Sequence, residues 1–227
     1  MRNIEVFLLE TIYFLIVSGI CVLIYYRTRE IYRISRHQGI RHFRNIFFYF
    51  AIAYIFRFIE VSFLIYRNLL SARFPGFHQL ILIPITYFSS MAIFSIIAAI
   101  FISKIKSGGL KMDAFMHIAS ISFALFSFMT RSHADIIILQ TSILSLSIVY
   151  IILRNRDFKA KNAFGKKKAI YYLLFVFWVL NLITLDRRAL PFAFDIIVYL
   201  ACVLIFFSIY RRVKKRLCID GKEKGPS

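Results

Sequence analysis

Five polar residues interrupt long apolar stretches of the sequence, where ionisable groups are rare. Arg57 and Glu60 stand three residues apart, so both fall on one face if their stretch is helical. Glu10, Asn181 and Asp195 come from three other apolar stretches. Ionisable groups at membrane depth are costly and usually face the interior of a helix bundle. We predict a binding site made of these five residues.

Two interpretations of these groups are open. In the first, Arg57 and Glu60 neutralise each other as a structural pair, with Arg57 near mid-depth and Glu60 one turn closer to the outside. In the second, the predicted helices gather Glu10, Arg57, Glu60, Asn181 and Asp195 in their outer halves, where they line a polar cavity open to the outside.

No set of residues has the spacing of a catalytic or metal site. The zinc motif His-Glu-x-x-His, the nucleophile elbow Gly-x-Ser-x-Gly and the Walker phosphate loop are all absent from the sequence. Asp113 and His117 share a helix face, but near the predicted inner membrane surface, where solvated polar residues are ordinary. We therefore expect no catalytic residue, no metal and no cofactor, and a protein that is not an enzyme.

The composition indicates a polytopic membrane protein that is all-α. Of the 227 residues, 60% are hydrophobic and 18% aromatic, well above the apolar share of about 45–50% in soluble domains. Apolar runs of about 17–25 residues are long enough to cross a bilayer as helices. The sequence predicts seven such helices in a single domain over 1–210, followed by a basic cytoplasmic tail over 211–227, the helices being at about 4–26, 45–66, 79–103, 112–130, 136–153, 169–185 and 191–210.

The positive charges predict the orientation of these helices. Of the 30 Lys and Arg, 23 fall in the alternate segments 27–44, 104–111, 154–168 and 211–227, and six fall in the segments between them. Cytoplasmic loops carry the excess of positive charge. We expect the N-terminus outside, the C-terminus in the cytoplasm and the protein in the cell membrane.

The same charges suggest what the cytoplasmic face contacts. A basic surface beside a membrane is attracted to anionic lipid headgroups, so the lipid bilayer is the first expected partner. A protein partner at the cytoplasmic loops is the second. We expect no nucleic acid as a partner, because basic residues alone are not a recognition motif.

A resemblance to known proteins also implies a cell-membrane location. The first cytoplasmic loop and second helix resemble those of archaeal multi-pass membrane proteins whose function is uncharacterised. The resemblance runs from Tyr25-Tyr26-Arg27-Thr28-Arg29-Glu30-Ile31-Tyr32-Arg33 through His37-Gln38-Gly39-Ile40 to Phe43-Arg44 and Ala53-Tyr54-Ile55-Phe56-Arg57-Phe58. It covers about 35 residues. Read physically, the first helix continues to about Ser35, and Gly39 ends or turns it.

These observations favour a non-enzymatic membrane protein that acts as a sensor or a partner-binding module. The alternative is a transporter of a small ion or solute through the outward-facing polar cavity.

Overall fold

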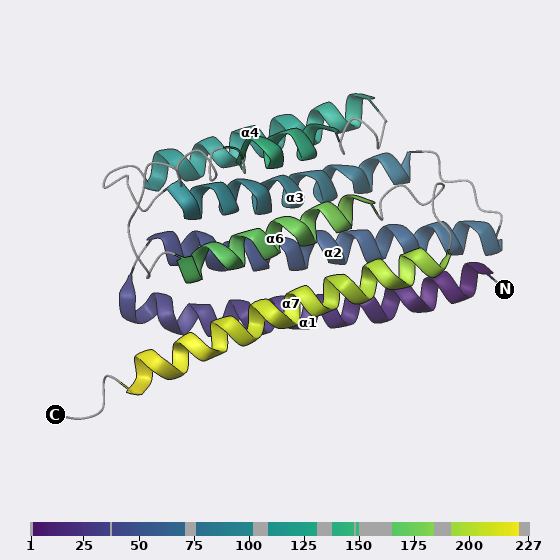
Figure 1. The fold of residues 1–227 in the computed structure, drawn as a ribbon. Helices are drawn as coiled ribbons and strands as arrows, with labels where there is room; N and C mark the ends of the chain where they lie inside the picture. The colour runs from purple at the N-terminus through teal and green to yellow at the C-terminus, as the bar shows by residue number, and fades with distance from the viewer. Residues whose placement is uncertain are drawn as a thin grey trace.

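The computed structural model describes residues 2–36, 38–70, 76–101, 109–130, 138–147, 149, 165–183 and 192–222, and all of these except Arg36 and Gly76 are helical (Figure 1). Six helices carry labels in Figure 1, and the short helix Ile138–Ser147 follows α4. Their bounds are α1 Arg2–Ser35, α2 Gln38–Leu70, α3 Phe77–Phe101, α4 Gly109–Thr130, α6 Gly165–Ile183 and α7 Phe192–Lys222.

Within the described ranges, five helices are long and apolar enough to cross a membrane. The candidate spans are Phe7–Arg33, Gln38–Phe63, Gln79–Ala99, Lys111–Thr130 and Ala193–Lys214. The chain is therefore that of a multi-pass membrane protein with an all-α fold. The crossing of the membrane by all seven helices, and their orientation, stay predictions.

The first two helices are longer than the hydropathy alone suggests. α1 ends at Ser35, as expected from its sequence, and α2 already begins at Gln38, so the predicted basic loop 27–44 is mostly helical. The chain reverses at Arg36, whose φ of 48° lies in the left-handed region. Gly39 lies in the first turn of α2 rather than at the end of α1. A non-glycine residue makes this turn, at the conformational cost that a left-handed φ carries.

The last helix also extends further than predicted. α7 continues to Lys222, so 211–222 of the basic tail is helical. The predicted apolar run ends at about 210 because Arg211 and Arg212 follow it. Arg and Lys are nevertheless good helix formers, so they do not end the helix. Hydropathy measures where a helix leaves the membrane and not where it ends.

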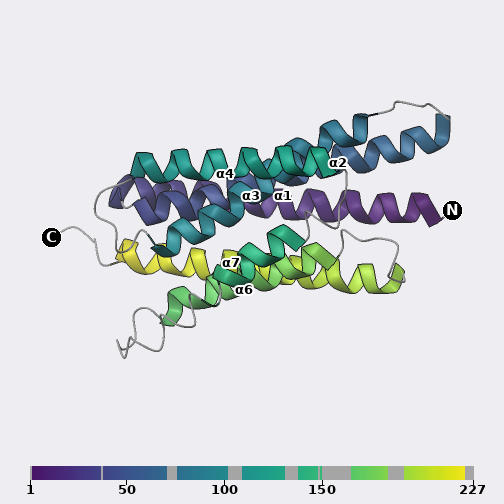
Figure 2. The same cartoon turned by 90° about the horizontal axis from the view of Figure 1, so that it is seen from above.

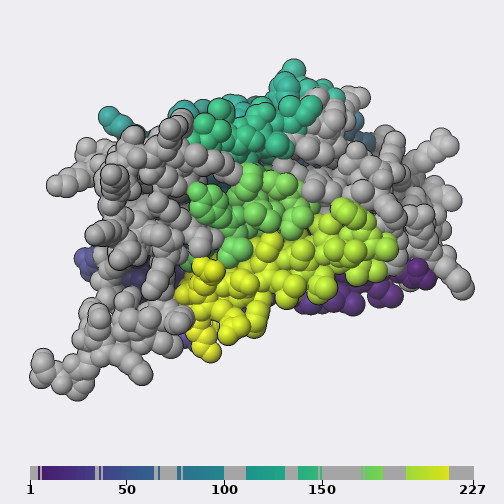
Figure 3. Space-filling model, viewed as in Figure 1, coloured from purple at the N-terminus to yellow at the C-terminus, as the bar shows by residue number. Residues whose placement is uncertain are grey.

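The helices run lengthwise and nearly side by side. α2 packs between α1 and α3, α4 packs on the far side of α3, and α7 lies against both α1 and α6 (Figures 1 and 2). α1 and α7 run in the same direction, with α2 antiparallel to them. The space-filling view shows α6 and α7 side by side across one face (Figure 3).

An aromatic core holds these helices together. Phe47 and Phe50 of α2 meet Phe177 of α6 and Phe206 of α7, all at most 1% exposed. The rings of Phe177 and Phe206 meet edge to face, with centroids 4.3 Å apart. Large apolar side chains such as Leu15 remain exposed on the outer faces, as expected where hydrocarbon replaces water.

The positive charge gathers at one end of the bundle. Among the described helices, every Lys and Arg except Arg2, Arg57 and Arg67 lies near the end of α1, the start of α2, the start of α4, the start of α6 or the end of α7. Alternate helix directions bring these segments to the same end (Figure 1). We call this end the basic end, and the opposite one, where α1 and α7 begin, the N-terminal end.

Candidate functional site: a polar cavity between three helices

A small cavity lies between α1, α2 and α7. Its polar lining comes from Glu10 and Tyr13 of α1, Tyr54 and Arg57 of α2, and Tyr199 of α7, and its apolar lining from Phe14, Phe58 and Val61. The centre of a water molecule can occupy about 20 Å³ of it. One water requires about 10–15 Å³ and two to four polar partners. The cavity therefore has room for about one water molecule.

Helical spacing places this lining on facing sides of the three helices. Glu10 and Tyr13 are three residues apart on α1, as are Tyr54 and Arg57 on α2, so each pair shares a face. Tyr13, Arg57 and Tyr199 each lie six residues from the end of their candidate span. At 1.5 Å per residue, the site is roughly 9 Å inside the N-terminal end of the spans.

Hydrogen bonds link the lining residues across the helices. The Tyr199 hydroxyl on α7 donates to Oε1 of Glu10 on α1 at 3.1 Å. The hydroxyls of Tyr13 and Tyr54 lie 2.9 Å apart, and either can be the donor. Glu10 is 7% exposed, so its carboxylate interacts with protein groups at a depth where water is scarce.

The Arg57 guanidinium supplies the positive charge of the site. It lines the same cavity as Glu10 and the three tyrosines. The side chain is half-buried. A carboxylate and a guanidinium close together at membrane depth offset part of each other's desolvation cost.

The structure brings two of the five predicted binding residues to this cavity. Glu10 and Arg57 line it, whereas Glu60 and Asp195 are half-buried and lie one turn away, Glu60 beyond Arg57 on α2 and Asp195 before Tyr199 on α7. Both lie toward the N-terminal end. Asn181 belongs to α6, and its side chain is outside the described part of the structure. The binding role of all five stays a prediction.

The three tyrosines were missed by the sequence reasoning. Aromatic residues make up 18% of the chain, so Tyr13, Tyr54 and Tyr199 did not stand out from the phenylalanines around them. One signal was available, because Tyr13 stands three residues after Glu10 and Tyr54 three before Arg57. A hydroxyl one turn from an intramembrane charge is a natural partner for it.

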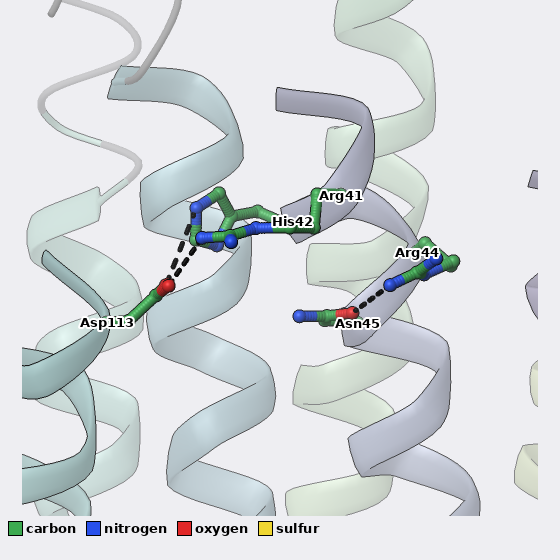
Figure 4. A network of polar contacts seen from close by, with 5 residues as sticks. All are labelled: Arg41, His42, Arg44, Asn45 and Asp113. Carbon is green, nitrogen blue, oxygen red and sulfur yellow. Dashed lines mark hydrogen bonds and ion pairs between the residues drawn. The ribbon is translucent and has the colours of Figure 1, made fainter. Parts of the chain in front are cut away.

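A second polar cluster ties α2 to α4 near the basic end (Figure 4). Arg41 forms an ion pair and hydrogen bond with Oδ2 of Asp113. His42 is 1% exposed, and its Nε2 lies 3.8 Å from Oδ1 of the same carboxylate. Arg44 donates to Asn45 at 3.4 Å and also lies 5.2 Å from the ring centroids of Tyr25 and of Tyr32. Asp113 is thus a partner of α2 and not merely a solvated surface residue.

A third group of polar contacts joins α3 to its neighbours. The Tyr87 hydroxyl lies 2.7 Å from Nδ1 of His117 on α4. Gln140 of the short helix donates to Ser89 at 2.5 Å, although Gln140 is only 3% exposed. Over the described ranges, no three His, Cys, Asp or Glu side chains come close enough together to hold a metal ion.

Comparison with known proteins identifies a distant relative. An uncharacterised protein of the archaeon Archaeoglobus fulgidus is 27% identical over 212 residues, 92% of each chain. No protein-family model matches the chain, and no solved structure matches it. This relative supports the predicted resemblance to an uncharacterised archaeal protein, and it does so over far more than 35 residues.

Proposed function

We propose that the protein is a non-enzymatic membrane sensor, in which the state of the polar cavity controls the contacts of the basic end. One observation carries this proposal. The three helices that line the cavity, α1, α2 and α7, each continue from it without a break to the basic end. A change in how they pack at the cavity is thereby transmitted along rigid elements.

Each of the three helices carries a cavity residue and basic residues far along it. On α1, Glu10 precedes the exposed Arg33 by 23 residues, about 35 Å of helix. On α7, Tyr199 precedes the exposed Arg211 and Arg212 by little more than three turns. On α2, the basic residue far from Arg57 is Arg41, which lies at the basic end and forms an ion pair with Asp113 of α4.

The basic end is suited to an acidic partner. Arg29 and Arg33 of α1 and Arg211 and Arg212 of α7 are exposed there. Such residues bind anionic lipid headgroups, at about 1 kcal/mol for each residue near the surface, and the acidic surface of a protein partner. We place this end on the cytoplasmic side, following the distribution of positive charge.

A transporter of a small ion or solute is the second candidate. The buried Glu10 beside Arg57 favours it, because ionisable groups at membrane depth often mark transport pathways. Two features favour the sensor instead. The cavity has room for about one water, and α1, α2 and α7 pass it without a break, whereas transporter sites typically form where helices are interrupted.

The test measures the distance between α1 and α7 at the basic end in variants whose cavity residues are substituted. Spin labels on Arg33→Cys and Arg212→Cys, with Cys218→Ser to remove the thiol in the tail, report the distance between α1 and α7 in the full chain reconstituted in lipid. We expect Glu10→Gln and Tyr199→Phe to shift that distance distribution, and the control Tyr66→Phe, an exposed tyrosine of α2, to leave it unchanged.

An unchanged distribution in both folded cavity variants would contradict the sensor. Ion flux into vesicles carrying the wild-type protein is measured in parallel, with Na⁺, K⁺ and Cl⁻ as probes. Flux that is lost in Glu10→Gln but kept in Tyr66→Phe would replace the sensor by the transporter.

A further inference from the structure

We infer that the antiparallel pair α1 and α2 binds one anionic phospholipid at the basic end, with the lipid phosphate on Arg44 between the rings of Tyr25 and Tyr32. This inference rests on the proposed function, since it names the partner that the basic end contacts. It is carried by the contacts of Arg44, by the absence of a described carboxylate beside it and by the exposed surfaces that adjoin it.

Two tyrosine rings of α1 hold the Arg44 guanidinium in place. Its central carbon lies 5.2 Å from the ring centroid of Tyr25 and 5.2 Å from that of Tyr32. A guanidinium is attracted to the face of an aromatic ring, and more strongly so where water is scarce. The side chain is therefore positioned before a ligand arrives, which reduces the entropy lost on binding.

The charge of Arg44 has no carboxylate partner among the side chains that the structure describes. At the basic end, Glu30 and Asp113 each form an ion pair with another arginine, and Figure 4 shows Arg44 on the side of α2 away from Asp113. Arg44 donates to Asn45 at 3.4 Å, whereas a guanidinium has five N–H donors. It retains donors for a phosphate, whose oxygens an arginine binds through paired hydrogen bonds.

Arg44 also lies at the depth of the lipid headgroups. It is six residues inside the candidate span Gln38–Phe63, and Tyr32 is one residue from the end of the span Phe7–Arg33. Six residues correspond to roughly 9 Å of helix, a depth from which a long basic side chain reaches the interface. Tyrosines concentrate at the same interface. The anion found at this depth is the phosphate of a lipid.

The surface beyond Arg44 suits the acyl chains of the same lipid. Phe48, Ile55 and Ile59 follow Arg44 at helical spacing on one face of α2, and they are 40–44% exposed. The charged group therefore stands at the end of an apolar stripe that faces outward. A phospholipid matches both parts, whereas the acidic surface of a soluble protein matches only the charge.

Two further arginines favour a headgroup with a net negative charge. Arg29 and Arg33 are exposed and stand four residues apart on one face of α1, and Arg33 directly follows Tyr32. A choline headgroup has a positive charge next to its phosphate, which these arginines repel. A glycerol headgroup has none, so the phosphate keeps its full attraction.

Native mass spectrometry of the full chain in detergent tests the inference, with phosphatidylglycerol as the probe and phosphatidylcholine as the comparison. The wild type should bind one phosphatidylglycerol more tightly than phosphatidylcholine. Arg44→Met should weaken that binding by about tenfold, the loss expected for a charged hydrogen bond. Lys111→Met removes the same charge from the exposed start of α4 and should leave the binding unchanged. Equal affinity in the wild type and Arg44→Met would overturn the inference.

Tyr32→Leu is the second variant, in case Arg44→Met does not fold. It removes one ring and keeps the charge, so it should also weaken the binding of phosphatidylglycerol. Tyr66→Leu, at an exposed position near the other end of α2, should not. Equal affinity in these two variants would count against the site. Inorganic phosphate that binds as tightly as the lipid, or poly-glutamate that binds in preference to it, would replace the lipid by a soluble phosphate or by an acidic protein.

The spin-label distances separate this inference from the sensor. If Arg44→Met loses the lipid while Glu10→Gln leaves the distances unchanged, the lipid site stands and the sensor is removed. If the distances respond to Glu10→Gln while Arg44→Met keeps the lipid, the sensor stands and the lipid site is removed.

Discussion

The ring of Tyr13 on α1 stacks on the ring of Tyr199 on α7, with centroids 4.4 Å apart and planes inclined by 23°. The same Tyr13 meets Tyr54 of α2 edge to face at 5.8 Å and shares a hydroxyl hydrogen bond with it. Such ring pairs contribute about 0.5–1.5 kcal/mol beyond the area they bury. Tyr13 is therefore the residue at which the three cavity helices meet.

Removing the Tyr13 hydroxyl should weaken the bundle modestly, and removing its ring should weaken it strongly. Tyr13→Phe keeps the stack on Tyr199 but loses the bond to Tyr54, and should lower the free energy of unfolding by about 1 kcal/mol. Tyr13→Ala loses both and should cost about 3–5 kcal/mol. Denaturant unfolding in detergent measures both, with Tyr26→Phe, an exposed tyrosine, as the matched control. If Tyr13→Phe and Tyr26→Phe lower the free energy of unfolding equally, the buried hydrogen bond between Tyr13 and Tyr54 contributes no net stability.

Arg57 should be energetically coupled to Glu10. Glu10→Gln leaves the guanidinium without that counter-charge, so it should destabilise the protein more than the double change Arg57→Met with Glu10→Gln does. We expect a coupling energy of about 1–3 kcal/mol from a double-mutant cycle of thermal melts in detergent. Strictly additive losses would mean that the two side chains share a cavity without interacting.

The sequence made the same prediction for Glu60, which lies one turn from Arg57. Glu60→Gln should destabilise the protein more than Arg57→Met combined with Glu60→Gln, if the two form one pair. Running both cycles on the same protein shows which carboxylate carries more of the interaction. A larger coupling with Glu60 than with Glu10 would favour the structural pair over the cavity.

The ion pair between Arg41 and Asp113 should contribute a small, salt-dependent stabilisation. Both side chains are 30% exposed, so water screens the pair and its value should be about 0.5–1 kcal/mol. A cycle with Arg41→Gln and Asp113→Asn measures it at low and at high salt, where screening should reduce it. Arg29→Gln, on the exposed surface of α1, is the control. A coupling that does not fall with salt would show that the pair is more buried than its exposure indicates.

The orientation predicted from charge can be tested by labelling. In a background with Cys218→Ser, Ser132→Cys should react with an impermeant thiol reagent from outside the cell, and Asn162→Cys only after the cells are opened. The remaining Cys21 and Cys202 are buried and should stay unlabelled. Reaction of both engineered thiols from one side would contradict the alternation of seven crossings.

Much of the helical architecture could be predicted from the sequence, because the free energy of transferring a segment from water to hydrocarbon depends on its composition. Apolar runs located the five long helices of the structure within a few residues at most ends, and Glu10 and Arg57 stood out as charges that hydrocarbon does not tolerate alone. The start of α2 and the end of α7 did not follow, since a helix with basic residues continues into water as readily as in the membrane.

The tertiary structure alone decided which side chains meet. The sequence offered Glu10, Arg57, Glu60, Asn181 and Asp195 as one site and paired Arg57 with Glu60, because depth in the membrane can be counted along a helix but rotation about its axis relative to a neighbour cannot. Packing of α1, α2 and α7 placed Glu10 and Arg57 in one cavity and left Glu60 and Asp195 one turn outside it. The same rotation turned Tyr13 and Tyr199 onto each other, a contact between residues 186 positions apart that no local pattern encodes.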